Sequence, residues 1–417
     1  MRRLIFPLLA RLFVFFLATG SSPAHGEAAS PVLHPVVLVP GYTCSNLDAR
    51  LTNEYRPPPG MPWCDASKGK GWFRLWKNYT ALQADPRLVP CYADQLRLVY
   101  DHAAGDYRNA PGVQTRVVAF GTTRGFGSDD PEQLHGETGD DTRRSRVQRQ
   151  REPVRHPYDF RYAAAPPGQP SRVFTSDVSR LRRLVEHASS KNGGNAVTVK
   201  LVILVSHAFG GHYVLQFLHR SPPPWRRRMV KHYLMLTTGV GGDVSVLRVI
   251  ASNDAGPSAP GDVLSYANTS RSFASPLAVL PSPRVFGRAP VFLAAVGFPA
   301  GDVAPRYMGR ALPVTLGLRA PLVPTTSVVG VGLPTPARLT YGDGGFGKMP
   351  RVVNGDGDGA INWEAVLAWR TVMEKDPDQG YFKSVLLPNV THNGILSDDL
   401  ALKRLVEILA AANQATS

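Results

Sequence analysis

The sequence is short of long apolar runs, of cysteine, and of aromatic residues near its basic clusters. Beyond the N-terminus, no apolar stretch of the 417 residues is long enough to cross a bilayer, which excludes several transmembrane helices. The net charge of +15 comes in part from residues 143–155, and this cluster has no aromatic side chain on which a base could stack. We therefore expect no nucleic-acid partner. A solvated loop is the favoured interpretation of the cluster, and attraction to an anionic membrane is the alternative.

The first 28 residues have the layout of a secretory signal. Two arginines, an apolar segment and a run of small residues follow one another within residues 1–28. This is the order of the charged region, the hydrophobic region and the cleavage site. We expect a removed signal peptide, with a retained anchor as the alternative, and a secreted or endomembrane-associated product. Three glycosylation sequons, which begin at Asn78, Asn268 and Asn389, are compatible with that route.

The three cysteines predict one pair and one odd thiol. Cys64 and Cys91 bracket a Trp-rich segment, whereas Cys44 stands apart. In an oxidising compartment we expect Cys64 and Cys91 to form a disulfide. Its restriction of the unfolded chain contributes about 3.6 kcal/mol in the chain-entropy model. Cys44 is then the odd, partly buried thiol.

Strand and helix patterns alternate along the rest of the chain. Apolar runs predict the strands, and one-sided apolar faces between capping residues predict the helices. The expected strands lie at residues 34–41, 112–121, 157–162, 199–205, 351–353 and 384–387, a further Gly-rich strand exit lies at residues 235–242, and the expected helices lie at residues 176–192, 212–219, 363–373 and 398–411. Because strands and helices alternate, we predict an α/β fold with a mostly parallel sheet, in a single domain over residues 29–417.

The most informative segment is residues 206–211, with the sequence Ser-His-Ala-Phe-Gly-Gly. It lies between an apolar strand pattern and a helix, which is the layout of the nucleophile elbow G-x-S-x-G. That elbow presents a hydroxyl at its apex, where this chain has Ala208. Ser206 lies two residues earlier, at the end of the strand, so we expect its hydroxyl to point away. The context predicts an elbow whose apex has no nucleophile.

An acid and a histidine follow in the order that an elbow of this type requires. Asp358, in the Asp-Gly stretch 354–359, comes just after a predicted strand, where its carboxylate can orient an imidazole. His392 lies in the loop before the last helix, which is the position of a general base. A calcium loop is the alternative for the Asp-Gly stretch, but Ala360 breaks its pattern. We expect Asp358 and His392 as acid and base, with no metal and no cofactor.

Together these segments resemble the lecithin:cholesterol acyltransferase family, and in particular its plant lecithin-cholesterol acyltransferase-like 1 group. The matching segments are residues 34–50, 72–76, 157–162, 206–211, 355–359 and the loop around His392. The resemblance implies an α/β-hydrolase fold with a disulfide-tied lid at about residues 55–95, which Cys64 and Cys91 match, and a cap excursion at about residues 243–340.

The resemblance also implies a chemistry and a set of partners. The family's reaction is acyl transfer from a phospholipid, through a serine acyl-enzyme, to a sterol, another lipid alcohol or water. The expected partners are therefore phospholipid and sterol or another lipid alcohol, at a membrane surface or on lipid particles. By the same resemblance, the backbone N–H groups of Tyr42 and Phe209 form the oxyanion hole.

The chain departs from the family pattern at three places. Position 208 has Ala in place of Ser, residues 132–156 are an Arg-rich irregular insert in place of a helix and the start of a strand, and family residues are missing within 288–292. We therefore predict that this copy is inactive or severely impaired. The alternatives are a non-catalytic lipid-binding protein and the product of a decayed or mis-assembled gene.

Overall fold

The computed structural model describes residues 33–121, 153–191, 200–251, 269–287, 290–294, 297–298, 302–343 and 345–415. The predicted signal peptide and most of the Arg-rich insert lie outside these ranges, so both stay predictions. Among the helices in the described ranges, none has the length and apolar character needed to cross a membrane.

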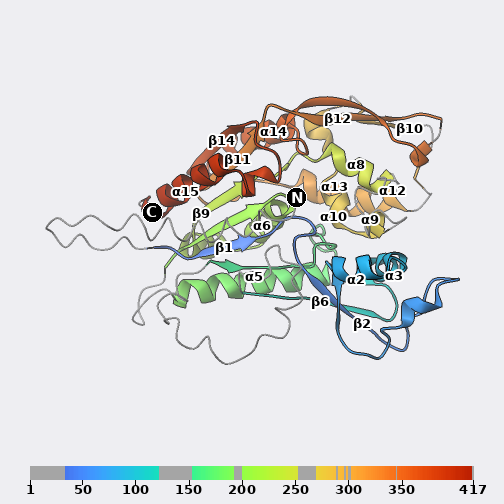
Figure 1. The fold of residues 1–417 in the computed structure, drawn as a ribbon. Coiled ribbons are helices and arrows are strands. Elements are labelled where there is room, and N and C mark those ends of the chain that lie inside the picture. The colour runs from blue at the N-terminus through green and yellow to red at the C-terminus, as the bar shows by residue number, and fades with distance from the viewer. Residues whose placement is uncertain are drawn as a thin grey trace.

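Six parallel strands form the central sheet (Figure 1). Their order across the sheet is β14-β11-β9-β8-β1-β7, and every neighbouring pair is parallel. The strands are β1 (Val36–Val39), β7 (Val154–Arg155), β8 (Val202–His207), β9 (Val230–Leu236), β11 (Thr325–Val331) and β14 (Phe382–Pro388). All residues of β8 and β9 are buried, as expected for central parallel strands that are covered on both faces. The predicted mostly parallel sheet is confirmed.

Helices cover both faces of this sheet. The helices of one face are α5 (Arg172–Lys191), α6 (Phe209–His219), α7 (Pro223–Met229) and α14 (Trp363–Lys375). Leu204 of β8 packs in the core of that face, and its neighbour Ile203 packs in the core of the other. α15 (Asp399–Gln414) covers this second face, and Figure 1 shows α5 and α15 on opposite sides of the strands. Because side chains alternate along β8, successive residues pack into two separate apolar layers, one on each face of the sheet.

An antiparallel excursion precedes the second strand of the central sheet. Its three strands have the order β3-β2-β6, and β4 and β5 form a separate hairpin. The elements are β2 (Leu47–Leu51), the 3-10 turn η1 (Pro62–Asp65), β3 (Phe73–Trp76), α2 (Tyr79–Ala84), α3 (Leu88–Leu96), β4 (Leu98–Asp101), β5 (Asp106–Asn109) and β6 (Val113–Val117). β6 is the strand expected at residues 112–121, and it pairs in this excursion.

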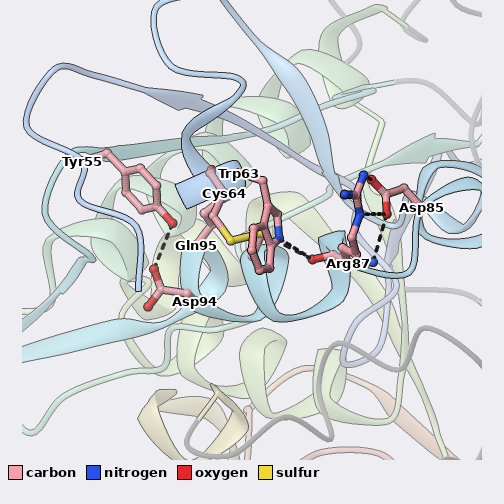
Figure 2. The surroundings of a disulfide bond; sticks show 8 residues. Tyr55, Trp63, Cys64, Asp85, Arg87, Asp94 and Gln95 are labelled. Carbon is pink, nitrogen blue, oxygen red and sulfur yellow. Dashed lines mark hydrogen bonds and ion pairs between the residues drawn. A yellow bond between two sulfur atoms is a disulfide. The ribbon is translucent and has the colours of Figure 1, made fainter. Parts of the chain in front are cut away.

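A disulfide between Cys64 and Cys91 joins η1 to α3 (Figure 2). Around it, the side-chain amide of Gln95 donates to the Cys64 carbonyl oxygen at 3.0 Å. The indole N–H of Trp63 donates to the Arg87 carbonyl oxygen at 3.1 Å. The predicted pairing is confirmed, and the two segments that it joins are also linked by hydrogen bonds.

A second small sheet and a group of short helices lie between β9 and α14 in the sequence. The sheet has the order β10-β12-β13. The elements are α8 (Val244–Ala251), α9 (Thr269–Ser272), α10 (Ser275–Ala278), α11 (Pro283–Phe286), β10 (Phe292–Ala294), α12 (Val303–Arg306), the π-helical turn η5 (Tyr307–Ala311), α13 (Leu312–Leu316), β12 (Leu333–Tyr341), the 3-10 turn η6 (Gly345–Gly347) and β13 (Arg351–Gly357). β11 lies in the same stretch of sequence but joins the central sheet, a strand that the Pro-rich sequence around it did not predict.

Residues 157–162 are not the strand that we expected. Two of their backbone N–H groups donate to side chains instead of to a neighbouring strand. Tyr158 N–H donates to Ser45 Oγ at 3.2 Å, and Asp159 N–H donates to a carboxylate oxygen of Asp177 at 3.1 Å. The segment is a buried loop that follows the short strand β7.

Two further local expectations were wrong. α5 begins at Arg172 and not near Asp177, and the carboxylate of Asp106 accepts the Arg172 N–H at 2.9 Å. This acceptor comes from a hairpin distant in sequence, so no local pattern could reveal it. Cys44 is a free thiol, but it is exposed and not partly buried. It lies in a turn closed by its own N–H, which donates to the Gly41 carbonyl oxygen at 3.2 Å.

Candidate active site

The chain turns sharply at Ala208, between β8 and α6. Ala208 has φ 51° and ψ −122°, a conformation that residues other than glycine rarely adopt. Its N–H donates to the Leu236 carbonyl oxygen at 2.9 Å, and its own carbonyl oxygen accepts from Gly211 N–H at 2.9 Å. A strained turn between a buried strand and a helix is the geometry of a nucleophile elbow. Ala208 lies at its apex.

The apex is in close contact with the loop after β1. A β carbon on Gly210 would lie 2.5 Å from the carbonyl oxygen of Pro40. Only glycine lets the first turn of α6 approach that carbonyl so closely. A β carbon on Gly41 would lie 3.3 Å from Cβ of Ala208. The loop after β1 and the apex of the turn are therefore in direct contact.

Tyr42 and Phe209, the expected oxyanion pair, lie on the two sides of this contact. Tyr42 follows Gly41 in the loop, and Phe209 is the first residue of α6. Their rings meet edge to face, with centroids 6.4 Å apart. The N–H groups of a helix's first turn have no acceptor within the helix, which makes a helix N-terminus a site for negative charge. The two residues are neighbours at the apex, and their role as oxyanion donors stays a prediction.

Asp358 is buried just after β13, and its carboxylate accepts three hydrogen bonds. The donors are Ala360 N–H at 3.0 Å, Ile361 N–H at 2.7 Å and His392 Nδ1 at 2.9 Å. A β carbon on Gly330 of β11 would lie 2.9 Å from Cβ of Asp358, so the residue packs against the central sheet. The carboxylate thus lies near the carboxyl end of a central strand, where open parallel sheets place their sites.

His392 lies in the loop between β14 and α15. Its backbone N–H donates to the Asp358 carbonyl oxygen at 2.9 Å, so one residue holds both its main chain and its ring. The Asp358 side chain has no exposed surface, whereas that of His392 is 19% exposed. Because Nδ1 donates to the carboxylate, Nε2 is the nitrogen that can take up a proton. The structure brings the two predicted residues together as a hydrogen-bonded pair, and their roles as acid and base stay a prediction.

A second histidine, His207, ties this pair to the elbow. Nε2 of His207 lies 3.1 Å from the His392 carbonyl oxygen, and the two ring centroids are 5.1 Å apart. Burial lowers the pKa of His207 to about 4, so the ring is neutral at pH 7 and donates through Nε2. Our sequence reasoning missed this role. The contact joins residues 185 positions apart, and the only signal was the place of His207 beside Ala208.

The hydroxyl of Ser206 lies in the core. Its Oγ is 2.8 Å from the Tyr233 hydroxyl, and the residue is 1% exposed. Tyr233 in turn donates to the Gly211 carbonyl oxygen at 3.3 Å. The position agrees with the place of Ser206 at the end of a strand, and it leaves this hydroxyl engaged beneath the elbow.

Asp243, just beyond β9, is a further carboxylate that the sequence reasoning missed. One of its oxygens accepts the Ser245 N–H at 2.7 Å. Burial raises the pKa of Asp243 to about 6, the negative charge of Asp358 adds to the rise, and His392 opposes it. Asp243 thus lies close enough to Asp358 and His392 for their charges to act on its carboxyl group, although burial is the main cause of its raised pKa. Its signal in the sequence was its position directly after the Gly-rich strand exit at residues 235–242.

The Asp-Gly stretch 354–359 forms the end of β13 and the loop that carries Asp358. Asp356 accepts the Gly332 N–H at 2.7 Å and so ties β13 to the turn between β11 and β12. Within the described part of the chain, no three His, Cys, Asp or Glu side chains gather as metal ligands.

A parallel sheet with an elbow after a central strand, followed along the chain by an acid and a histidine at the same edge, defines an α/β-hydrolase. The crystal structure of the Tle4-Tli4 complex contains a chain with a similar fold, with a TM-score of 0.50 and 12% identity. The match covers 93% of this chain and 100% of that one. At this identity the likeness concerns the fold alone.

Sequence comparison then gives the family. The family model for lecithin:cholesterol acyltransferase matches residues 72–291. Lecithin-cholesterol acyltransferase-like 1 of Oryza sativa subsp. japonica is 41% identical, over 93% of this chain and 89% of its own length. Lysosomal phospholipase A and acyltransferase of Homo sapiens is 28% identical, over 96% of this chain and 95% of its own length. The chain belongs to the lecithin:cholesterol acyltransferase family.

Proposed function

We propose that this chain is a lipid-binding member of the family that cannot form an acyl-enzyme. The observation that carries the proposal is Ala208 at the apex of an elbow whose surroundings are in place. Asp358 and His392 form a hydrogen-bonded pair, and the loop before Tyr42 packs against the apex. Acyl transfer through a serine needs a hydroxyl at that point, and a methyl group provides none.

The energetic consequence is large. In a serine protease, removal of the nucleophile lowers turnover about a million-fold, which corresponds to about 8 kcal/mol of transition-state stabilisation. About a thousand-fold acceleration over water then remains from the oxyanion hole and binding. In this proposal Tyr42 and Phe209 supply the oxyanion N–H groups, Asp358 is the acid, and His392 is the base. These groups bind and polarise an ester without cleaving it at a useful rate.

The names of the family and of its relatives indicate the ligand. We infer that a phospholipid enters the site as the ester, and that a sterol, another lipid alcohol or water is the second partner. The protein would meet both at a membrane surface or on lipid particles. The Cys64–Cys91 disulfide supports a secreted or endomembrane location, because disulfides persist in oxidising compartments. In this proposal, the disulfide-tied residues 55–95 form a lid and residues 243–340 carry a cap.

Binding and catalysis can be tested separately on the full chain. We expect the protein to float with phosphatidylcholine vesicles that contain cholesterol, and to retain phospholipid that mass spectrometry identifies. We expect no labelled fatty acid and no sterol ester. A protein that neither floats nor retains lipid would overturn the binding role. Acyl release that disappears in His392→Ala would overturn the proposed inactivity.

A second candidate is the product of a decayed or mis-assembled gene. The Arg-rich insert at residues 132–156 and the shortened segment at residues 288–292 favour it. It predicts poor expression and a broad, non-cooperative thermal melt. A sharp melt would leave the lipid-binding role as the better account, because a cooperative transition indicates a well-packed native state.

A further inference from the structure

The two sequons that lie in the described part of the chain differ in whether the fold leaves room for an oligosaccharide. A glycan attached at the Asn side chain must project into solvent, so an acceptor whose amide is enclosed by its own fold is a poor candidate. Asn78 and Asn389 can be compared directly, and Asn268 lies outside the described residues. The Cys64–Cys91 disulfide points independently to the compartments in which sequons are modified.

Asn389 has the geometry of an accessible acceptor. It is exposed at the end of β14 and adopts a left-handed backbone conformation, with φ 59°. Asn tolerates this conformation better than most residues. Its backbone N–H donates to the Val331 carbonyl oxygen at 2.7 Å, so the main chain is fixed while the residue stays exposed. In the part of the chain that the structure describes, no hydrogen bond engages its side-chain amide. Thr391, the third sequon residue, is also exposed.

Asn78 carries the same motif in a different environment. It is half-buried, and its amide nitrogen donates to the Arg74 carbonyl oxygen at 3.0 Å. Its side-chain oxygen accepts the Ala81 N–H at 3.2 Å and so caps α2. The side chain of the buried Tyr92 also interacts with it. A glycan on this nitrogen would displace the contacts that begin the helix, which makes Asn78 the internal comparison for Asn389.

We propose that Asn389 carries an N-linked oligosaccharide and that Asn78 does not. The donor class is an oligosaccharide linked to a lipid pyrophosphate. The amide nitrogen of Asn389 forms a bond to the anomeric carbon, and the bond from that carbon to the phosphate oxygen breaks. The amide proton passes to a base of the transferase, and the lipid pyrophosphate leaves. No oxidant or reductant is needed.

The position of Asn389 determines two effects of a glycan attached there. β14 is one of the two edge strands of the central sheet, so a glycan at its end obstructs edge-to-edge pairing with another chain. Asn389 also precedes His392 by three residues, in the loop between β14 and α15 that carries His392 but not Asp358. The glycan therefore borders the candidate site without occupying any residue of it.

The test is expression of the full chain in a eukaryotic secretory host, followed by peptide mass spectrometry. Release with peptide:N-glycosidase in heavy-oxygen water converts a glycosylated Asn to labelled Asp. We expect this label at residue 389 and none at residue 78. We expect Asn389→Gln to lower the intact mass by one glycan. Thr80→Ala removes the other sequon without touching the helix cap, and we expect no change in mass.

Asn268→Gln identifies any glycan at the third sequon. The mass of such a glycan is then not wrongly assigned to residue 389. An unmodified residue 389 in the wild-type chain would overturn the proposal, whether the protein is secreted or retained. A mass loss in Thr80→Ala would overturn its second half. If Asn389→Gln is not produced, the labelled wild-type peptide still decides. None of these readouts depends on lipid binding, so the proposed function can fail while this proposal holds.

Discussion

Ala208→Ser is the most direct test of the elbow. The left-handed backbone at this position is already adopted by Ala, and Ser has the same β carbon, so the substitution adds no backbone strain. Gly41 has no side chain to meet the new hydroxyl, although the loop is close enough for a β carbon there to lie 3.3 Å from Cβ of Ala208. We therefore expect the free energy of unfolding to change by less than about 1 kcal/mol.

The catalytic effect should be far larger than the structural one. If the pair of Asp358 and His392 is competent, a hydroxyl at position 208 restores up to about a million-fold in turnover, or about 8 kcal/mol. We expect fatty acid release from phosphatidylcholine vesicles and an acyl-enzyme visible by intact mass. Ala208→Ser with His392→Ala is the matched control, because it keeps the hydroxyl and removes the base.

A fluorophosphonate probe distinguishes a serine that is not activated from an active site that was given the wrong substrate. It labels an activated serine whatever lipid the protein prefers. A folded Ala208→Ser protein that reacts no faster with the probe than the double variant would refute the assignment of the elbow and of the pair. Labelling without phospholipid cleavage would keep the assignment and reject phospholipid as the substrate.

Three further predictions concern stability. Replacement of both Cys64 and Cys91 by Ala should lower the free energy of unfolding by up to about 3.6 kcal/mol in urea titrations, and a loss below about 0.5 kcal/mol would contradict the entropic role of the disulfide. His207 has its pKa lowered from 6.5 to about 4, so between these pH values the unfolded chain binds a proton that the folded chain excludes. The wild type should therefore lose up to about 3.4 kcal/mol from this residue as the pH falls from 7 to 4. His207→Gln should show a shallower decline in its urea midpoint, and equal slopes would count against the buried, neutral ring. Gly210→Ala puts a β carbon 2.5 Å from a backbone carbonyl oxygen and should cost about 1–3 kcal/mol, whereas Gly309→Ala, with nothing within 4 Å, should leave the melting temperature nearly unchanged.

Most of the central architecture was predictable because it depends on local pattern. The buried strand before the elbow, β8, begins as a continuous apolar run, and the last two helices have one-sided apolar faces between clear ends. β11 escaped prediction because a Pro-rich sequence surrounds it, although six of its seven residues are buried. Residues 157–162 gave the opposite error, because the sequence predicted a strand there that did not form. Side chains distant in sequence bind their backbone instead.

The candidate site also has features that the sequence predicted and features that it did not. Chain order alone selected Ala208, Asp358 and His392 as candidates, because the elbow, the acid and the histidine follow one another in a known order. The sequence also shows that the first of these residues has no hydroxyl. The pairing of Cys64 with Cys91 was likewise accessible from their spacing and from the family resemblance. These features depend on residue type and succession, which the sequence states directly.

Only the tertiary structure placed His207 against the His392 carbonyl, Asp358 against β11, and the loop of Gly41 against the apex. Each of these contacts joins segments far apart in the chain, and the last two depend on close packing at Gly330 and Gly41. The shifted pKa values of His207 and Asp243 likewise result from burial. No sequence pattern at either residue indicates that burial. The sequence therefore states which groups are present at the elbow, and packing alone determines which of them touch and in what charge state.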